Sequence, residues 1–290
     1  MQDLLQHLAI VMGQDLGHHR LTSVGGGDIN RAYHLQTAGF QAFLKVNHAS
    51  LADMFVAEAE GLQALAASAE VRVPRVLATG TYARNAYLLL EYLPLRPISN
   101  TAAKRLGQQM ARLHAQSQPY FGWHRDNTIG STPQLNGRYL DWSLFWGQQR
   151  LGKQLGWAAQ KGYTGLLQTQ GEKLLEALPV FFTAYQPQPA LLHGDCWGGN
   201  TAQDQLGVPV LFDPACYWGD READIAMTEL FGGFGPDFYA AYQTEYPLDA
   251  GYKVRRDLYN LYHILNHLNL FGSAYHSQAL QMMERLLAEV

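Results

Sequence analysis

The residue types best suited to chemistry lie in one short stretch, LLHGDCWGGN, at positions 191–200. Two leucines lead into His193 and Asp195, and Asn200 follows five residues after the aspartate. A short buried strand that ends in such a polar loop can hold these side chains at fixed positions over a cleft. A carboxylate can then accept the proton of a hydroxyl group, and an asparagine oxygen can bind Mg²⁺.

A second acidic motif, VLFDPA, follows the next short apolar run and places Asp213 thirteen residues after Asn200. The spacing H-x-D-x-x-x-x-N is that of the catalytic loop in phosphate-transferring enzymes, and Asp213 stands where their second metal-binding carboxylate belongs. We predict Asp195 as the catalytic base and Asn200 and Asp213 as Mg²⁺ ligands. Alternatively, both aspartates are turn residues that follow strands.

Phosphate transfer also requires a lysine on a strand and a glutamate that pairs with it. Of the six lysines, Lys45 alone lies inside an apolar strand-like run, AFLKV. In the helical pattern MFVAEAEGLQALAA, Glu58 shares the apolar stripe of Phe55 and Leu62, whereas Glu60 should face solvent. We predict a catalytic ion pair between Lys45 and Glu58; a lysine that extends from an edge strand into water is the alternative.

Two further segments are candidates for ATP binding. The stretch SVGGGDINRAY precedes the lysine strand, and its backbone N–H groups could cover phosphates, although a plain turn has the same composition. The run LLLEYL could form a hinge whose main-chain groups face the adenine. The predicted nucleotide-binding residues are Gly25, Gly26, Gly27, Lys45, Glu91, Tyr92 and Leu93.

The elements that must position these residues divide the chain into two lobes. Pro94 and Pro97 interrupt any strand or helix, so we predict a boundary there, with lobes over 1–93 and 94–290. The fold class is therefore α+β: a small β-rich N-terminal lobe with one key helix, and a larger, mainly helical C-terminal lobe. Apolar periodicity predicts helices over 2–16, 54–67, 101–116, 141–160, 165–185, 222–231, 235–245 and 252–271, and strands over 42–46, 86–93, 189–193 and 209–212.

Composition narrows the function classes. The 290 residues are 47% hydrophobic and 16% charged, which is typical of a folded globular protein. A net charge of −4 with no basic stripe argues against nucleic acid, and no apolar run is long enough for a membrane helix. We expect a cytoplasmic protein that acts on a small molecule, with Cys196 and Cys216 as buried thiols.

With these residues assembled, the chain resembles the fructosamine-3-kinase (ketosamine-3-kinase) family, which is related to aminoglycoside and choline phosphotransferases and to protein kinases. The HGDxWxGN form of the catalytic loop, with Trp197, carries the resemblance. So do the segments AFLKVN, MFVAEAEGLQAL, DNTIGSTPQLN, DWSLFWGQQRLGKQL, DPACYWGDREADIAM, LFGGF and LNHLNLFG. The resemblance implies a protein-kinase-like bilobal fold, with ATP and Mg²⁺ as cofactors. It also implies phosphorylation of the O3 hydroxyl of ketosamines, the adducts of ribulose, fructose or erythrulose with amines, and hence deglycation repair.

The same resemblance implies an acceptor site for a free or protein-borne ketosamine. We also expect a monomeric protein. Trp197 would stack on the sugar, or else brace the loop, and His267 would contact the substrate from a helix. Asp126, Asn127 and Gln134 would form a wall of this site, or else a solvated loop. His193 is expected to be structural.

Two other functions remain open at this point. One is a kinase of the same superfamily that acts on an aminoglycoside or a choline-like alcohol. The other is a non-catalytic nucleotide-binding protein, although such proteins usually lose one of the five key positions that this chain retains.

Overall fold

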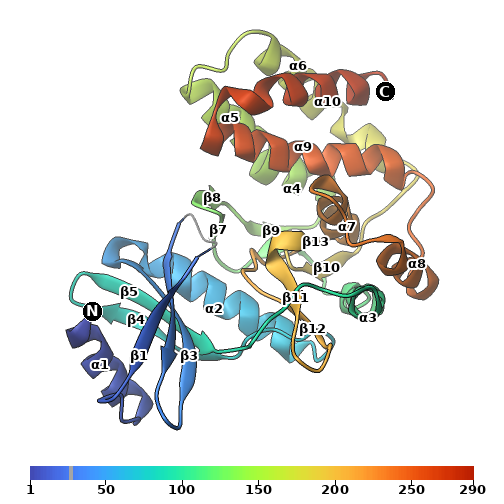
Figure 1. The fold of residues 1–290 in the computed structure, drawn as a ribbon. Coiled ribbons are helices and arrows are strands. Elements are labelled where there is room, and N and C mark those ends of the chain that lie inside the picture. The colour runs from blue at the N-terminus through green and yellow to red at the C-terminus, as the bar shows by residue number, and fades with distance from the viewer. Residues whose placement is uncertain (26–28) are drawn as a thin grey trace.

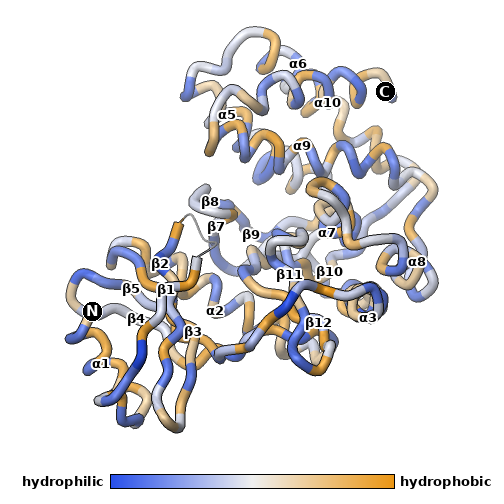
Figure 2. Tube along the Cα trace, in the orientation of Figure 1, coloured by the Kyte–Doolittle hydropathy of each residue, from blue (hydrophilic) through white to orange (hydrophobic). Residues whose placement is uncertain are grey.

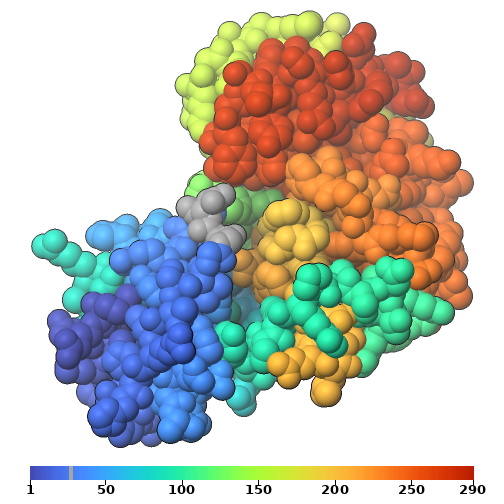
Figure 3. All heavy atoms as spheres, in the orientation of Figure 1, coloured from blue at the N-terminus to red at the C-terminus, as the bar shows by residue number. Residues whose placement is uncertain are grey.

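The computed structural model describes residues 1–25 and 29–290, which form a sheet lobe followed by a larger helical lobe (Figure 1). The predicted two-lobed α+β arrangement is confirmed. Figure 3 shows the surface hollowed between the blue N-terminal lobe and the red C-terminal helices. The predicted phosphate-binding residues Gly26 and Gly27 lie outside the described residues.

The N-terminal lobe is built on one five-stranded antiparallel sheet with strand order β1-β2-β3-β5-β4. Its strands are β1 (Arg20–Val24), β2 (Arg31–Gln36), β3 (Gln41–His48), β4 (Val76–Tyr82) and β5 (Asn85–Glu91). Helix α1 (Gln2–Met12) covers one face, and α2 (Ala52–Ala67) packs against the other. Because both faces are buried, β5 reads as a continuous apolar run.

Side-chain alternation along β3 decides where its lysine points. Leu44 and Val46 pack with the leucines of α1, so Lys45 lies on the opposite face, toward α2. Its cross-strand partner Leu88 packs on the α2 side as well. Because side chains alternate along a strand, Lys45 lies on the face of the sheet that packs against α2, the helix that carries Glu58.

Several predicted ends differ from the structure. Helix α1 stops at Met12 rather than at residue 16, because Gly13 adopts a left-handed conformation with φ of 59° and closes the helix. Strand β5 ends at Glu91 rather than at residue 93. The predicted lobe boundary lies between β5 and the first helix of the second lobe, α3.

Helices make up most of the second lobe. They are α3 (Asn100–His114), α4 (Trp142–Phe145), a π-helical turn (Trp146–Leu151), α5 (Gly152–Gln160), α6 (Leu166–Ala177), α7 (Arg221–Leu230), α8 (Pro236–Glu245), α9 (Tyr252–Phe271) and α10 (His276–Leu287). Short 3₁₀ turns are Ala49–Leu51, Leu178–Phe182, Gly198–Asn200 and Ser273–Tyr275. Figure 2 shows hydrophobic and hydrophilic residues alternating along these helices, as expected for segments with one buried face. The predicted helix over 165–185 ends early and continues as a 3₁₀ turn, and α10 was not predicted.

Three small sheets complete this lobe. Their strands are β6 (Phe121–Trp123), β7 (Asn127–Ile129), β8 (Thr132–Gln134), β9 (Gly137–Tyr139), β10 (Pro189–Leu192), β11 (Thr201–Gln203), β12 (Pro209–Leu211) and β13 (Tyr217–Asp220). Strand β10 belongs to the sheet β10-β13-β6-β9, whereas β12 pairs with β11, and β7 with β8. The two acidic motifs thus follow strands of different sheets. Within the described residues, none of the helices has the length and apolar character that a membrane span requires.

Candidate active site

Backbone hydrogen bonds join the two acidic motifs into one structure. Ala215 N–H donates to His193 O at 2.8 Å, and Phe212 N–H donates to Asn200 O at 3.1 Å. Gly194 has φ of 82°, and a Cβ at this position would lie 2.1 Å from Ala215 O. Glycine is therefore required where the two segments touch.

The buried carboxylate of Asp224, on α7, holds the loop that carries Asp195. It accepts hydrogen bonds from His193 N–H at 2.7 Å and from Gly194 N–H at 2.9 Å. His114 Nε2 lies 3.3 Å from the same carboxylate. Burial alone would raise the pKa of Asp224, but hydrogen bonds from His114 and the loop amides lower it, so the group stays ionised. We predicted no role for Asp224, and its sequence signal is weak: a carboxylate between Ala223 and Ile225 in a helix that carries other charged residues.

The predicted base and the predicted metal ligand are in direct contact. Asn200 Nδ2 donates to Asp195 Oδ2 at 2.8 Å and to Asp195 O at 3.0 Å. This geometry fixes the Asp195 carboxylate and turns Asn200 Oδ1 away from it. Burial raises the pKa of Asp195 to about 7, and the hydrogen bond from Asn200 opposes that rise. His193 is fully buried, with Nε2 3.1 Å from Phe212 O, which agrees with a structural role.

A three-membered ion cluster lies between the lobes. Lys45 Nζ is 2.6 Å from Glu58 Oε1 and 2.6 Å from Asp213 Oδ1. Burial alone would lower the pKa of Lys45, but the two carboxylates raise it, so the lysine is a cation here. The predicted contact between Lys45 and Glu58 is confirmed, and Asp213 joins it with an unusual positive φ of 55°. Non-glycine residues are uncommon in this conformation, which aspartate tolerates better than most, and Ala69 and Ala83 share it outside the site.

Helix α2 is fixed to the second lobe by charges outside the predicted set. Arg125 Nη1 lies 2.9 Å from Glu60 Oε1, and Arg125 also pairs with Asp53. His124 Nε2 is 2.9 Å from Glu60 Oε2. We predicted that Glu60 faces solvent. Instead, it pairs with Arg125 and His124 and helps to hold the helix that carries Glu58.

An aromatic group lies beside the catalytic loop. The Phe231 ring stacks on His267, with 5.0 Å between centroids and 14° between planes, and Trp197 meets Phe231 edge-on at 6.0 Å. Trp197 and Phe231 remain 36% and 37% exposed, so part of each ring is open to a ligand. Burial lowers the pKa of His267, which favours a neutral imidazole. Phe231 was not predicted as a site residue, although it lies within the segment LFGGF.

Comparison with known proteins decides the family. A sequence model described as "Fructosamine kinase" matches residues 1–289. The chain belongs to the fructosamine kinase family.

Relatives in this family match nearly the whole chain. A "Probable ketoamine kinase" of Synechocystis sp. (strain ATCC 27184 / PCC 6803 / Kazusa) is 43% identical over 287 residues, covering 99% of this chain and 96% of that protein. The "Protein-ribulosamine 3-kinase, chloroplastic" of Arabidopsis thaliana is 39% identical over 289 residues, covering 99% and 88%.

Solved structures show the same architecture. A fructosamine-3-kinase candidate from Haemophilus somnus 129PT has a TM-score of 0.88 at 29% identity, with 98% of this chain and 96% of that chain covered. The choline kinase LicA from Streptococcus pneumoniae has a TM-score of 0.66 at 12% identity, covering 100% and 99%. The latter likeness concerns the fold alone, and it confirms the predicted protein-kinase-like architecture.

In this member of the fructosamine kinase family, the predicted acceptor wall needs correction. Gln134 is 1% exposed; its Nε2 donates to Ala215 O and Asn127 Oδ1, and its Oε1 accepts from Tyr262. Asn127 Nδ2 donates to Cys216 O at 2.8 Å. Both side chains thus brace the segment after Asp213, and the buried Gln134 has no surface to offer an acceptor. Asp126 is exposed, and its carboxylate accepts from Asn136 N–H.

Part of the predicted hinge is engaged in contacts within the N-terminal lobe. Glu91 N–H donates to Arg75 O at 2.8 Å, so this group is used within the N-terminal lobe and does not face a nucleotide. The Glu91 carboxylate pairs with Arg72 at 2.8 Å. Tyr92 stacks on His34 of β2 with 3.6 Å between centroids, which adds an aromatic surface next to the predicted contact Leu93.

The site offers only a few protein oxygen atoms, which suits Mg²⁺ bound together with phosphate better than a metal held by protein ligands alone. Within the described ranges, no cluster of three or more His, Cys, Asp or Glu side chains could hold a metal. Asn200 Oδ1 and the half-exposed Asp213 carboxylate remain as two oxygen donors. Mg²⁺ is commonly bound in this way, by one or two protein oxygens completed by phosphate oxygens and water.

Proposed function

We propose that this chain transfers the γ-phosphate of ATP to the O3 hydroxyl of ketosamines. The observation that carries the proposal is the site itself: Asp195 held by Asn200, beside a Lys45 that pairs with Glu58 and Asp213. The family match and the names of the relatives, ketoamine kinase and protein-ribulosamine 3-kinase, favour a ketosamine over an aminoglycoside or choline. The retained polar residues favour an enzyme over a non-catalytic protein.

Each residue of the site has a distinct task in this reaction. The Asp195 carboxylate accepts the proton of the sugar hydroxyl, while the amide of Asn200 keeps it in place. The Lys45 ammonium contacts phosphate oxygens, and Glu58 keeps that ammonium oriented. Mg²⁺ bound by Asn200 Oδ1 and Asp213 would neutralise negative charge on the phosphates. The main chain at Gly25–Gly27 and at Leu93 is the proposed contact for the rest of the nucleotide.

An ATP-consumption assay tests this function directly. With Mg²⁺ we expect turnover of ribulose- or fructose-derived lysine and little turnover of an aminoglycoside or choline, since the site must match the acceptor hydroxyl. Removal of divalent cations with EDTA should abolish turnover, and added Mg²⁺ should restore it. Turnover of the aminoglycoside alone would assign the chain to the alternative acceptor class. Nucleotide binding without turnover of any acceptor would indicate a non-catalytic protein.

The aromatic group should contribute to acceptor binding. A ketosamine offers hydroxyls and a cationic amine but little apolar surface, so a flat aromatic face and one ring nitrogen can select it. We expect Trp197→Ala and His267→Ala each to lower kcat/KM for the ketosamine at least about tenfold, or about 1.4 kcal/mol of transition-state binding. Calorimetry should show nearly unchanged ATP affinity. Parallel losses of ATP affinity and thermal stability would instead make both residues supports of the loop.

A further inference from the structure

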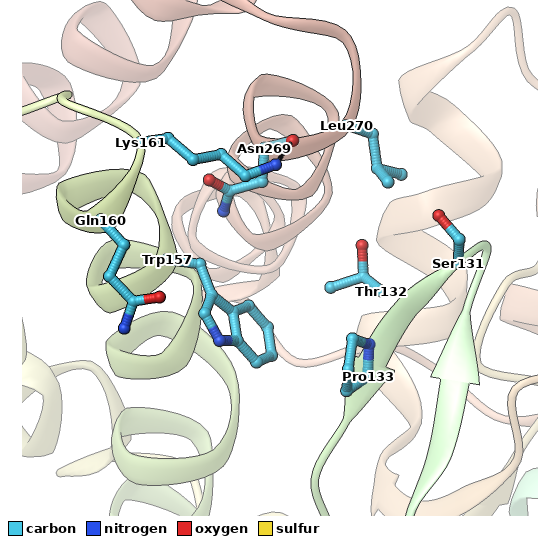
Figure 4. A pocket seen from close by; sticks show the side chains of 8 residues that line it. All are labelled: Ser131, Thr132, Pro133, Trp157, Gln160, Lys161, Asn269 and Leu270. Atoms are coloured by element: carbon cyan, nitrogen blue, oxygen red, sulfur yellow. Dashed lines mark hydrogen bonds between the residues drawn. The ribbon is translucent and has the colours of Figure 1, made fainter.

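A pocket of about 260 Å³ lies between the β7–β8 hairpin and the ends of helices α5 and α9, apart from the ion cluster (Figure 4). It is lined by Ser131, Thr132, Pro133, Trp157, Gln160, Lys161, Asn269 and Leu270. Figure 4 shows the Trp157 indole between the helix and the hairpin, with Lys161 directed toward Asn269. None of these residues has a task in the proposed reaction.

The chemistry of the pocket suits a carboxylate attached to an apolar chain. The Lys161 ammonium donates to Asn269 O, a carbonyl in the last turn of α9. An ammonium group has three donors, so two remain for a ligand. Ser131 and Thr132, which both carry hydroxyls, line the same pocket, and the Trp157 indole supplies an apolar surface. Capping of α9 alone would account for the Lys161 contact, but not for the hydroxyls and the indole gathered around it.

The pocket also lies close to the N-terminal lobe and to the helix that carries His267. A Cβ on Gly130, at the hairpin turn, would lie 3.6 Å both from Ile29 Cδ1 and from Leu270 Cδ1. The hairpin turn thus lies between the chain after the glycine-rich stretch and the last turn of α9. Leu270 follows His267 by three residues, so both occupy one side of the helix.

We propose that this pocket binds the amino-acid end of a ketosamine formed on a free amino acid. The inference rests on the proposed function and narrows its substrate class to free glycated amino acids over glycated proteins. The α-carboxylate pairs with the Lys161 ammonium and accepts from the hydroxyls of Ser131 or Thr132. The aliphatic chain of the amino acid lies along Trp157. A volume near 260 Å³ is sufficient for one amino acid, and a peptide bond in place of the carboxylate would remove the charge that Lys161 binds.

The test compares two substrates that differ only in that charge: Nε-ribulosyl-lysine and its α-carboxamide. We expect the wild-type protein to prefer the free acid at least about tenfold in kcat/KM, the usual effect of one good charged contact. Lys161→Ala should reduce this preference to less than about threefold, because it removes the charge that the carboxylate pairs with. Lys153→Ala, on the same helix but outside the pocket, should keep the preference.

Three results would overturn the inference. The first is equal kcat/KM of the wild-type protein for the two substrates, and the second is an equal loss of kcat/KM for both in Lys161→Ala together with a lower melting temperature. The third is the same reduction of the preference in Lys153→Ala. All three leave the proposed function intact, because the wild-type protein still phosphorylates the ketosamine. If the wild-type protein phosphorylates neither substrate, although it binds ATP, the proposed function fails and the pocket assignment fails with it.

Discussion

Asp195→Asn is expected to lower kcat for the ketosamine by roughly 10²–10⁴-fold, the usual contribution of a positioned acid or base. The amide keeps the shape of the carboxylate but cannot accept the hydroxyl proton. The loop should stay in place, because Asp224 and the backbone bonds to the Asp213 segment hold it independently of the Asp195 side chain. Steady-state kinetics give the loss in kcat, and calorimetry with ATP shows whether nucleotide binding is retained.

Asp237→Asn is a matched control for this change. It makes the same carboxylate-to-amide substitution at an exposed position in the first turn of α8, and we expect activity within about twofold of wild type, as is usual for surface substitutions. Near wild-type turnover in Asp195→Asn would show that Asp195 is not the base.

The second large effect is expected for Lys45→Met, which should lower kcat/KM at least about 10²-fold, as the loss of a preorganised charge does at other transition states. Methionine preserves the length and apolar part of the side chain but removes the cation that pairs with both Glu58 and Asp213. Burial already raises the pKa of Glu58, so this carboxyl can take up a proton and the variant should still fold. Kinetics at several ATP concentrations measure the loss, and circular dichroism monitors the fold.

Two neighbouring glutamates provide the control for this ion pair. Glu58→Gln should lower kcat/KM more than tenfold, because a neutral amide orients the ammonium of Lys45 less firmly. Glu60→Gln should cost less than about threefold, since Arg125 keeps its second partner, Asp53, and α2 stays in place. Equal losses in the two variants would contradict the assignment of Glu58 as the partner of Lys45.

Much of this site was predictable, because its residues depend on short-range periodicity. A period of two puts Lys45 on one face of its strand, and a period of 3.6 separates Glu58 from Glu60 on the next helix. The spacing of Asp195 and Asn200 within one loop likewise requires no knowledge of distant segments. These local rules single out Lys45, Glu58, Asp195, Asn200 and Asp213, and the tertiary structure brings them together.

Helix ends and hinge contacts were less predictable, because they depend on a few weak local interactions. Gly13 ends α1 at Met12, four residues before the predicted end of the helix at residue 16. The N–H of Glu91 is used by Arg75, sixteen residues away, and no local pattern indicates that pairing.

The sequence by itself thus determined the two lobes, the residue types of the catalytic site and the faces on which they lie. Only the tertiary structure decided which buried polar side chain meets which partner. It places Asp224 under the catalytic loop, turns Gln134 onto the main chain behind Asp213 and stacks Phe231 on His267. The physical reason is that periodicity reports whether a side chain is buried, whereas its hydrogen-bond partner comes from a segment far along the chain, and only the packing of the two segments brings them within reach.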